Sequence, residues 1–186
     1  MELREYQRSA IDAIYEHWQG GGGNALIEVA TGLGKAYIIA TICRELLQQY
    51  PKLRVLMLVH TRELVAQNAQ ELLRAWPGAP LGINSAGLGR RDWRSQILFA
   101  SIQSVYKKPE LLGDRDLIIG DEVHLWPHSG DGMYRTLLAA LLERVPDLRV
   151  LGCTATPYRL DSGRLDGGEG ALFDKIVFRY GIGEGV

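Results

Sequence analysis

The stretch "ALIEVATGLGKAYIIA" (residues 25–40) passes from a strand-like apolar run, through a glycine-rich turn, into a helical pattern. Glycines in such a turn let backbone N–H groups curl around phosphate oxygens, and the amino end of the following helix adds partial positive charge. Lys35 stands where its ammonium would reach the β- and γ-phosphates of a nucleotide. The stretch therefore predicts a phosphate-binding loop between a strand and a helix.

This loop departs from the strict pattern G-x-x-x-x-G-K-[ST] at two positions. Val29 stands at the first glycine, and Ala36 stands at the final Ser or Thr. The hydroxyl lost at Ala36 is one that would bind Mg²⁺, whereas Lys35 is retained. Taken alone, the loop leaves a second interpretation open, a glycine-rich turn that carries a surface lysine.

A second stretch, "LIIGDEVH" (117–124), is an apolar run that ends in two adjacent carboxylates. Asp121 can hold Mg²⁺ directly or through water, and Glu122 can orient and deprotonate an attacking water. An acidic loop after a strand is common by itself. A Gly-Lys loop followed by this acidic pair in one chain is much rarer by chance, so the two together predict a nucleotide site.

Apolar runs alternate with helical patterns along the whole chain. The runs are short and rich in Val, Ile and Leu, which is typical of strands buried on both faces of a parallel sheet. We expect strands at 25–30, 53–60, 95–101, 116–121 and 148–155, a last strand within 171–180, and helices at 5–18, 35–49, 62–75 and 132–144. The Gly- and Asp-rich segment 161–170 is expected to be a surface loop. The alternation predicts an α/β domain with a mainly parallel sheet and helices on both faces.

Composition narrows the class of protein. The 186 residues are 46% hydrophobic and 23% charged, with a net charge of −1, so a nucleic-acid partner would need a local basic patch. Cys43 and Cys153 both lie in apolar stretches, which favours buried free thiols in a reducing, cytoplasmic compartment. No run reaches the length of a membrane span, so we expect no membrane partner.

The motifs "ATGLGK", "DEVH" and "TATP" (154–157), in this order, resemble those of the first RecA-like P-loop domain of superfamily 2 helicases, the DEAD/DEAH-box-like group. Further stretches agree with the resemblance: "LREYQRSAI" (3–11), "VHTRELVAQ" (59–67), "SIQSV" (101–105) and "CTATP" (153–157). It covers nearly the whole chain. It implies one ATP-binding domain over residues 1–186, whose partner, a second RecA-like domain with an arginine finger, lies outside this sequence.

The resemblance also implies a role for each matching residue. ATP would be bound by Arg4 and Gln7 at the adenine and by Thr31, Gly32, Leu33, Gly34, Lys35 and Ala36 at the phosphates. Lys35, Asp121 and Glu122 would be catalytic, with Asp121 holding Mg²⁺. His124, Thr154 and Thr156 would couple hydrolysis to strand movement. Thr61, Arg62, Gln67, Ser101 and Gln103 would contact the backbone of DNA, with RNA the less favoured partner.

Within the superfamily, "AGLGRR" (86–91) and "LGCTATPYRLDSGRL" (151–165) are most similar to the bacterial RadD-like DNA-repair helicases. Besides Ala36, the chain departs from the group at Gly120, where a bulky aliphatic residue is usual, and in reading DEVH rather than DEAH. Two other readings stay open. One is a degenerate module that binds nucleotide or DNA without turnover, and the other is the motor portion of a restriction or remodelling enzyme.

Two further patterns have weaker interpretations. His124 and His128 have a spacing that suits zinc, but no third ligand stands near them in the sequence. "GRRDWR" (89–94) offers three arginines around Trp93 for phosphate contact and base stacking, or equally a solvated loop with Trp93 partly buried.

Ala36 leads to a selective expectation. Nucleotide binding should survive the missing hydroxyl, while Mg²⁺-dependent hydrolysis should be weakened. In a protein that contains both RecA-like domains, Ala36→Thr should therefore raise ATPase activity. Unchanged activity would show that the metal does not need the hydroxyl.

Overall fold

The computed structural model describes residues 3–126, 132–159, 163–166 and 170–181. Within them, an eight-stranded sheet has the order β10-β1-β7-β6-β2-β5-β3-β4, parallel throughout except for the β3–β4 pair. Its strands are β1 Ala25–Val29, β2 Val55–Val59, β3 Leu81–Ser85, β4 Arg90–Arg91, β5 Ile97–Ser101, β6 Leu117–Asp121, β7 Arg149–Thr154 and β10 Lys175–Tyr180. The α/β class and the mainly parallel sheet predicted from the sequence are confirmed.

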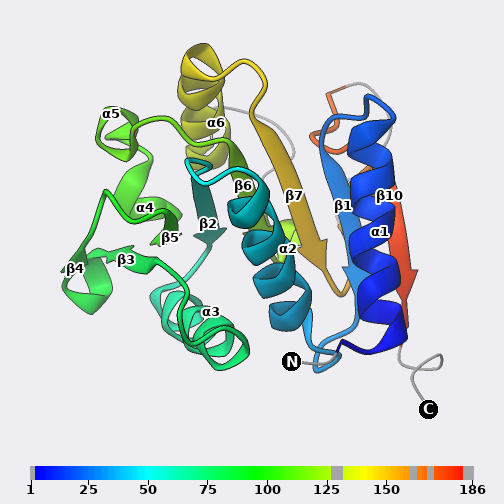
Figure 1. Ribbon diagram of the computed structural model, residues 1–186. Coiled ribbons are helices and arrows are strands. Elements are labelled where there is room, and N and C mark those ends of the chain that lie inside the picture. Colours follow the sequence, from blue (N-terminus) through cyan, green and yellow to red (C-terminus); the bar gives the residue numbers. More distant parts are fainter. Residues whose placement is uncertain (1–2, 127–131, 160–162, 167–169, 182–186) are drawn as a thin grey trace.

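Helices cover both faces of the sheet. The longer ones are α1 Glu5–Gln19, α2 Lys35–Gln49, α3 Arg62–Ala75 and α6 Met133–Arg144, and the short ones are α4 Ile102–Val105 and α5 Pro109–Leu112. Figure 1 shows α1 and α2 lying across the near face, with all long parallel strands running in the same direction. Their carboxyl ends therefore meet at one edge, near the starts of α2 and α3.

Alternate residues of each strand enter two different cores. In β2, Val55, Met57 and Val59 pack with α1, α2 and α3, while Leu56 and Leu58 pack with α4, α5 and α6. Every residue of β2 and β5 is buried. Because the side chains of a strand point to opposite faces, a strand covered on both sides must be apolar at every position, which is the pattern that identified these strands.

Two strands of the sheet were not predicted. β3 and β4 lie at one sheet edge and read "LGINS" and "RR", without the continuous apolar run of the central strands. Edge strands pack less side-chain surface, so composition marks them weakly.

The surface loop expected at 161–170 is wrong in its described part. Gly163–Arg164 forms β9, which pairs with β8 (Tyr158–Arg159), and Leu165 and Asp166 are buried. Asp166 Oδ2 accepts a hydrogen bond from the Ile176 N–H near the start of β10. Gly170 is exposed in a turn, as expected for a loop, and the other residues of that segment lie outside the described ones.

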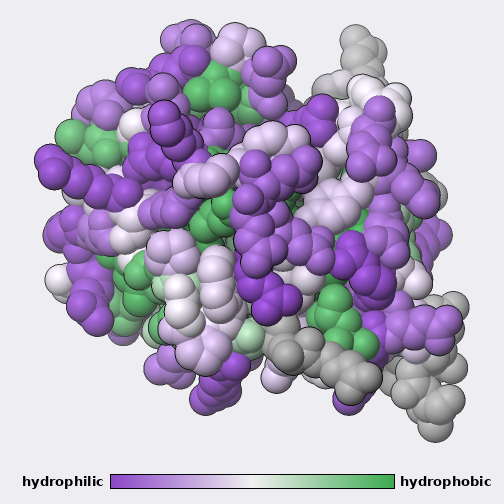
Figure 2. Space-filling view, viewed as in Figure 1, coloured by the Kyte–Doolittle hydropathy of each residue, from purple (hydrophilic) through white to green (hydrophobic). Residues whose placement is uncertain are grey.

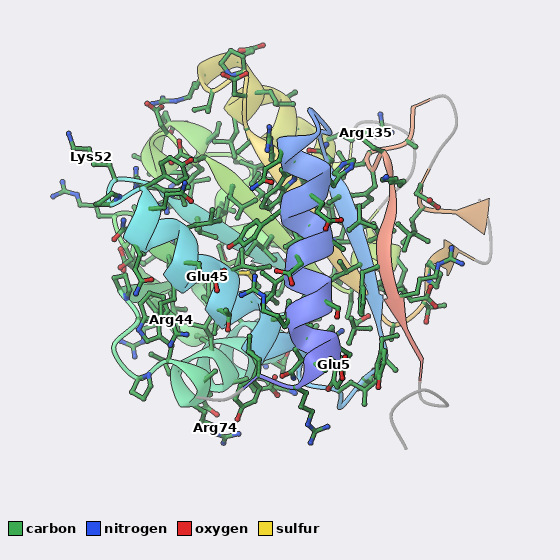
Figure 3. All side chains as sticks on the ribbon, turned by 45° about the vertical axis from the view of Figure 1, so that its right-hand side comes forward. Glu5, Arg44, Glu45, Lys52, Arg74 and Arg135 are labelled. Carbon is green, nitrogen blue, oxygen red and sulfur yellow. The ribbon has the colours of Figure 1, made fainter. Side chains whose placement is uncertain are left out.

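A partly buried carboxylate joins α1 to α2. Glu45 accepts hydrogen bonds from Arg8 Nη1 at 2.7 Å and from Tyr15 Oη at 3.0 Å, and Figure 3 shows its carboxylate between the two helices. The outward surface of these helices is predominantly hydrophilic in Figure 2. No helix among the described residues is long and apolar enough to cross a membrane.

Arg115 is fully buried at the amino edge of the sheet, opposite the phosphate loop. Its guanidinium donates hydrogen bonds to the carbonyl oxygens of Val55 (3.1 Å), Ser95 (2.9 Å), Trp93 (2.9 Å) and Leu112 (3.1 Å). These carbonyls belong to segments that precede or begin separate strands. One side chain therefore holds together several segments at the start of the strands. Burial and the nearby Arg54 lower the pKa of Arg115 to about 10, which still leaves it charged at neutral pH.

Candidate nucleotide site

The phosphate loop lies between the end of β1 at Val29 and the start of α2 at Lys35. Gly32 and Gly34 have φ of 83° and 75°, a backbone conformation that residues other than glycine rarely adopt. Tyr6 Oη donates to the Leu33 carbonyl at 2.6 Å, so α1 holds the loop from one side. No side chain caps the amino end of α2 and its first turn contains no acidic residue, which suits an anion.

The acidic pair lies beside this loop. Lys35 Nζ donates to Asp121 Oδ1 at 3.1 Å and to Glu122 Oε1 at 2.8 Å, and the three side chains are 14%, 12% and 22% exposed. Burial disfavours the ammonium, but the two carboxylates outweigh it and raise the pKa of Lys35 to about 12. The sequence separates Lys35 from the pair by more than eighty positions, and the parallel sheet brings them together.

Glu122 has a left-handed backbone, with φ of 48°, and is the one residue other than glycine with positive φ among those described. Such a conformation costs roughly 1–3 kcal/mol and persists only where its surroundings enforce it. Here it turns the chain sharply after β6, and the Glu122 N–H donates to Asp121 Oδ1 at 3.0 Å. Both carboxylates thereby face the loop.

The three residues expected to act in coupling lie together. His124 Nδ1 is 2.9 Å from Thr154 Oγ1 and 3.2 Å from Glu122 Oε2. Thr154 Oγ1 donates to the Thr156 carbonyl at 2.9 Å and accepts from the Thr156 N–H at 3.0 Å. Because the only hydroxyl hydrogen of Thr154 goes to Thr156, His124 Nδ1 is the donor in the first contact. His124 thus lies between Glu122, which its Nδ1 approaches to 3.2 Å, and the hydrogen-bonded segment after β7.

A cavity of about 300 Å³ lies beside the loop at the start of α1 and is lined by Arg4, Tyr6, Gln7, Gly32, Leu33, Gly34 and Tyr37. Arg4 is exposed there. Gln7 is 5% exposed, accepts from the Arg4 N–H at 3.0 Å and donates to the Leu33 carbonyl at 3.4 Å. The ring of Tyr6 stacks on Tyr180 of β10. Tyr6 and Tyr37 line this cavity although the sequence did not mark them as site residues.

Gly120 is explained by its neighbours. A Cβ at this position would lie 2.6 Å from Val123 Cγ1 and 2.7 Å from Trp126 Cη2. Trp126 is buried and stacks on Tyr134 with ring centroids 4.2 Å apart. The indole thus fills the space that an aliphatic side chain at residue 120 would take. The small residue at position 120 is therefore matched by the large one at position 126, and the backbone of the acidic pair stays in place.

Gly120→Ala should therefore destabilise the fold by about 1–3 kcal/mol through overpacking. Urea unfolding measures this, with Gly78→Ala as a control, since the nearest atom a Cβ would meet there is 3.8 Å away. Combined with Trp126→Leu, the loss should be smaller than the sum of the single losses. If the stability losses of Gly120→Ala and Trp126→Leu simply add in the double variant, the two residues do not share this space.

One neighbour of the site was missed by the sequence analysis. Asn68, on α3, donates from Nδ2 to Asp121 Oδ2 at 2.8 Å. Asn68 follows directly after the quoted stretch 59–67 and matches no motif, so no sequence signal marks it.

The residues expected to contact nucleic acid lie near the same edge, and all but one of them are exposed. Thr61, Arg62, Gln67 and Gln103 are exposed, and Gln103 Nε2 donates to the His60 carbonyl, which joins α4 to the turn before α3. Ser101 is only 5% exposed, and its hydroxyl lies 2.8 Å from Ser104 Oγ. Ser101 is therefore poorly placed for contact with a strand.

The two weaker patterns are resolved differently. Trp93 is partly buried against the core on the α6 side, so its indole is not a free stacking surface, while Arg90 and Arg91 are exposed on β4. His128 lies outside the described residues. Among the residues that are described, no three His, Cys, Asp or Glu side chains gather as a metal site.

The acidic pair does suit Mg²⁺. This ion prefers oxygen ligands and keeps several waters when one or two carboxylates and the substrate phosphates bind it. Asp121 supplies the carboxylate, and a small cavity of about 40 Å³ separates it from Ala36.

Comparison with known proteins identifies the family of the chain. The family described as type III restriction enzyme, res subunit (ResIII), matches residues 1–159. The chain is 32% identical to the putative ATP-dependent helicase IRC3 of Saccharomyces cerevisiae, over 97% of the chain and 26% of that protein. It is 30% identical to the ATP-dependent RNA helicase DHX58 of Mus musculus, over 90% of the chain and 26% of that protein.

Among solved structures, a nuclease-deletion mutant of the Type ISP restriction-modification enzyme LlaGI, in complex with a DNA substrate mimic, has the same fold. The TM-score is 0.70 at 18% identity, over 99% of this chain and 20% of that one. The chain thus spans about a quarter or less of the length of these relatives. The match over most of its length shows that the chain belongs to the ResIII family and is a superfamily 2 helicase ATP-binding domain.

Proposed function

We propose that this chain binds ATP and Mg²⁺ as the first motor domain of an ATP-dependent helicase or translocase that acts on DNA. The observation that carries the proposal is the contact of Lys35 with both Asp121 and Glu122 beside an open phosphate loop. The proposal assigns phosphate binding to Lys35, metal binding to Asp121 and the role of base to Glu122, and their contact supports it because one partly buried site would hold all three.

In this proposal, the loop N–H groups and Lys35 hold the phosphates, and Gln7 and Arg4 hold the adenine. Mg²⁺, when bound, would neutralise phosphate charge. Glu122 would orient and deprotonate the attacking water, and His124 would pass the state of the site to Thr154 and Thr156 through the contacts described above. Lys35 must leave the carboxylates to meet the phosphates, so nucleotide binding exchanges one set of ionic partners for another.

A second RecA-like domain would complete the site from the rest of the polypeptide. An arginine supplied in this way contributes about 10³–10⁵ in rate in related phosphoryl-transfer systems. We therefore expect the 186-residue chain alone to hydrolyse ATP slowly and to separate no strands. Cys43 and Cys153 are both buried and free, which suits a cytoplasmic location.

DNA is proposed as the partner because the family is that of a restriction-enzyme subunit and the LlaGI structure contains a DNA mimic. The exposed residues Thr61, Arg62, Gln67 and Gln103 would contact the phosphate backbone, so binding should be independent of sequence and sensitive to salt. A role in DNA repair, as in RadD-like helicases, extends this proposal through the stretches 86–91 and 151–165.

Titration with a fluorescent ATP analogue, with and without Mg²⁺, tests the proposal. A working motor domain should bind more tightly with the ion, whereas a degenerate module, which the missing hydroxyl at Ala36 favours, should be indifferent to it. Competition between single-stranded DNA and RNA of the same sequence tests the partner. Strand separation by the isolated chain, or a preference for RNA, would contradict the proposal.

A further inference from the structure

The site contains a gap and a neighbour that the loop motif does not account for. The cavity of about 40 Å³ beside Ala36 is lined on its polar side by Lys35, Asn68, Glu71 and Asp121. A cavity needs only roughly 10–15 Å³ to hold a water molecule. The rest of its lining is apolar, so Ala36 and Asn68 of α3 border one small cavity beside Asp121.

Asn68 fixes the metal-binding carboxylate from this space. Asp121 Oδ1 accepts from Lys35 Nζ and from the Glu122 N–H, and Asp121 Oδ2 accepts from Asn68 Nδ2 at 2.8 Å. Lys35 has to move to the phosphates when nucleotide binds. Asn68 is then the remaining side chain, among the described hydrogen-bond partners of Asp121, that can hold its orientation.

We propose that Asn68 is a positioning residue that compensates for the hydroxyl missing at Ala36, by holding Asp121 in the orientation that binds the nucleotide's Mg²⁺. In the usual loop, the hydroxyl and the carboxylate share the metal. Here one ligand is lost, so the orientation of the other matters more, and a charge-assisted hydrogen bond from a rigid helix fixes it. This inference rests on the proposed function, since it concerns the same ATP site.

The test is the gain in affinity that Mg²⁺ gives to a fluorescent, non-hydrolysable ATP analogue, measured on the 186-residue chain in Mg²⁺ and in EDTA. Asn68→Leu removes the hydrogen bond with little change in side-chain size. It should reduce the Mg²⁺-dependent gain by about tenfold, as expected for loss of a hydrogen bond to a charged group. Its affinity in EDTA should change less than about twofold, because Lys35 and the loop are untouched.

Two further variants separate positioning from folding. Gln70→Ala, an exposed residue on the same helix, should keep the full Mg²⁺-dependent gain. Ala36→Ser should restore most of the gain in the Asn68→Leu background, and should add less in the unaltered chain, because hydroxyl and amide serve the same carboxylate–metal pair. Thermal melting of each variant shows whether the fold is intact.

The outcomes are distinct. Three results would overturn the role of Asn68. The Asn68→Leu variant could lose affinity equally in Mg²⁺ and in EDTA, or it could keep the full Mg²⁺-dependent gain. The third is that Ala36→Ser does not restore the gain in the Asn68→Leu background. An unaltered chain that binds the analogue equally with and without Mg²⁺ overturns it too, while leaving nucleotide binding in place. An unaltered chain that binds no nucleotide in either condition overturns the proposed function itself.

Discussion

Replacing Glu122 with glutamine is expected to slow ATP hydrolysis about 10²- to 10⁴-fold, the usual contribution of a general base. The substitution keeps the size of the side chain and its contact distance to Lys35, 2.8 Å in this structure, but removes the group that takes the proton. Single-turnover hydrolysis by a protein that contains this chain and the proposed second RecA-like domain, with single-stranded DNA present, measures the effect.

Nucleotide affinity should separate this effect from a damaged site. Lys35 and the loop remain in Glu122→Gln, and the competing carboxylate is neutralised, so affinity should be unchanged or slightly higher. Glu143→Gln, at an exposed position on α6, should hydrolyse ATP normally. Hydrolysis within about threefold of the unaltered protein, against the fall expected for a general base, would mean that another group activates the water.

Arg115→Met should destabilise the fold by about 3–5 kcal/mol, because several buried carbonyl oxygens lose their donor at once. The side chain is fully buried and reaches carbonyls that precede or begin two strands and one that ends a short helix. Arg115→Lys should also be costly, since one ammonium cannot reproduce the planar fork of donors. Urea unfolding of the 186-residue chain gives both values.

An exposed arginine provides the comparison for this prediction. Arg144 pairs with Asp114 at 2.8 Å, and its side chain is 42% exposed. Arg144→Met should cost less than about 1 kcal/mol, as surface ion pairs do. If Arg115→Met unfolds at the same urea concentration as Arg144→Met, the buried hydrogen bonds of Arg115 contribute little. A chain too unstable to purify would agree with the prediction, provided that Arg144→Met is recovered normally.

Strands at the centre of the sheet were predictable, as was the edge strand β10, whereas β3 and β4 at the opposite edge were not. β2 and β5 are buried at every residue because each face of the sheet packs against its own core. This burial requires a continuous run of mainly apolar residues, which the sequence shows. β3 and β4 obey no such requirement. The buried Leu165 and Asp166 were mistaken for part of a surface loop because glycines on both sides dominate the local composition.

The site divides in a similar way. Lys35 and the pair Asp121–Glu122 are found from the sequence, because their roles require particular residue types at particular strand ends. Ser101 was assigned to the nucleic-acid surface by motif alone, and its burial depends on packing against residues 85 and 104. Gly120 looked like a defect until Trp126 was seen to occupy the space beside it.

The sequence by itself determined the class of fold, the order of its central elements and the residues of the phosphate loop and acidic pair. These follow from local patterns, since a buried strand, a glycine turn and a strand-end carboxylate each have a short signature. Only the tertiary structure decided that Asn68 holds Asp121 and that Arg115 ties the opposite edge together. Those contacts join residues 53 and 60 positions apart, and a hydrogen bond across such a distance depends on how helices pack on the sheet, which no local pattern specifies.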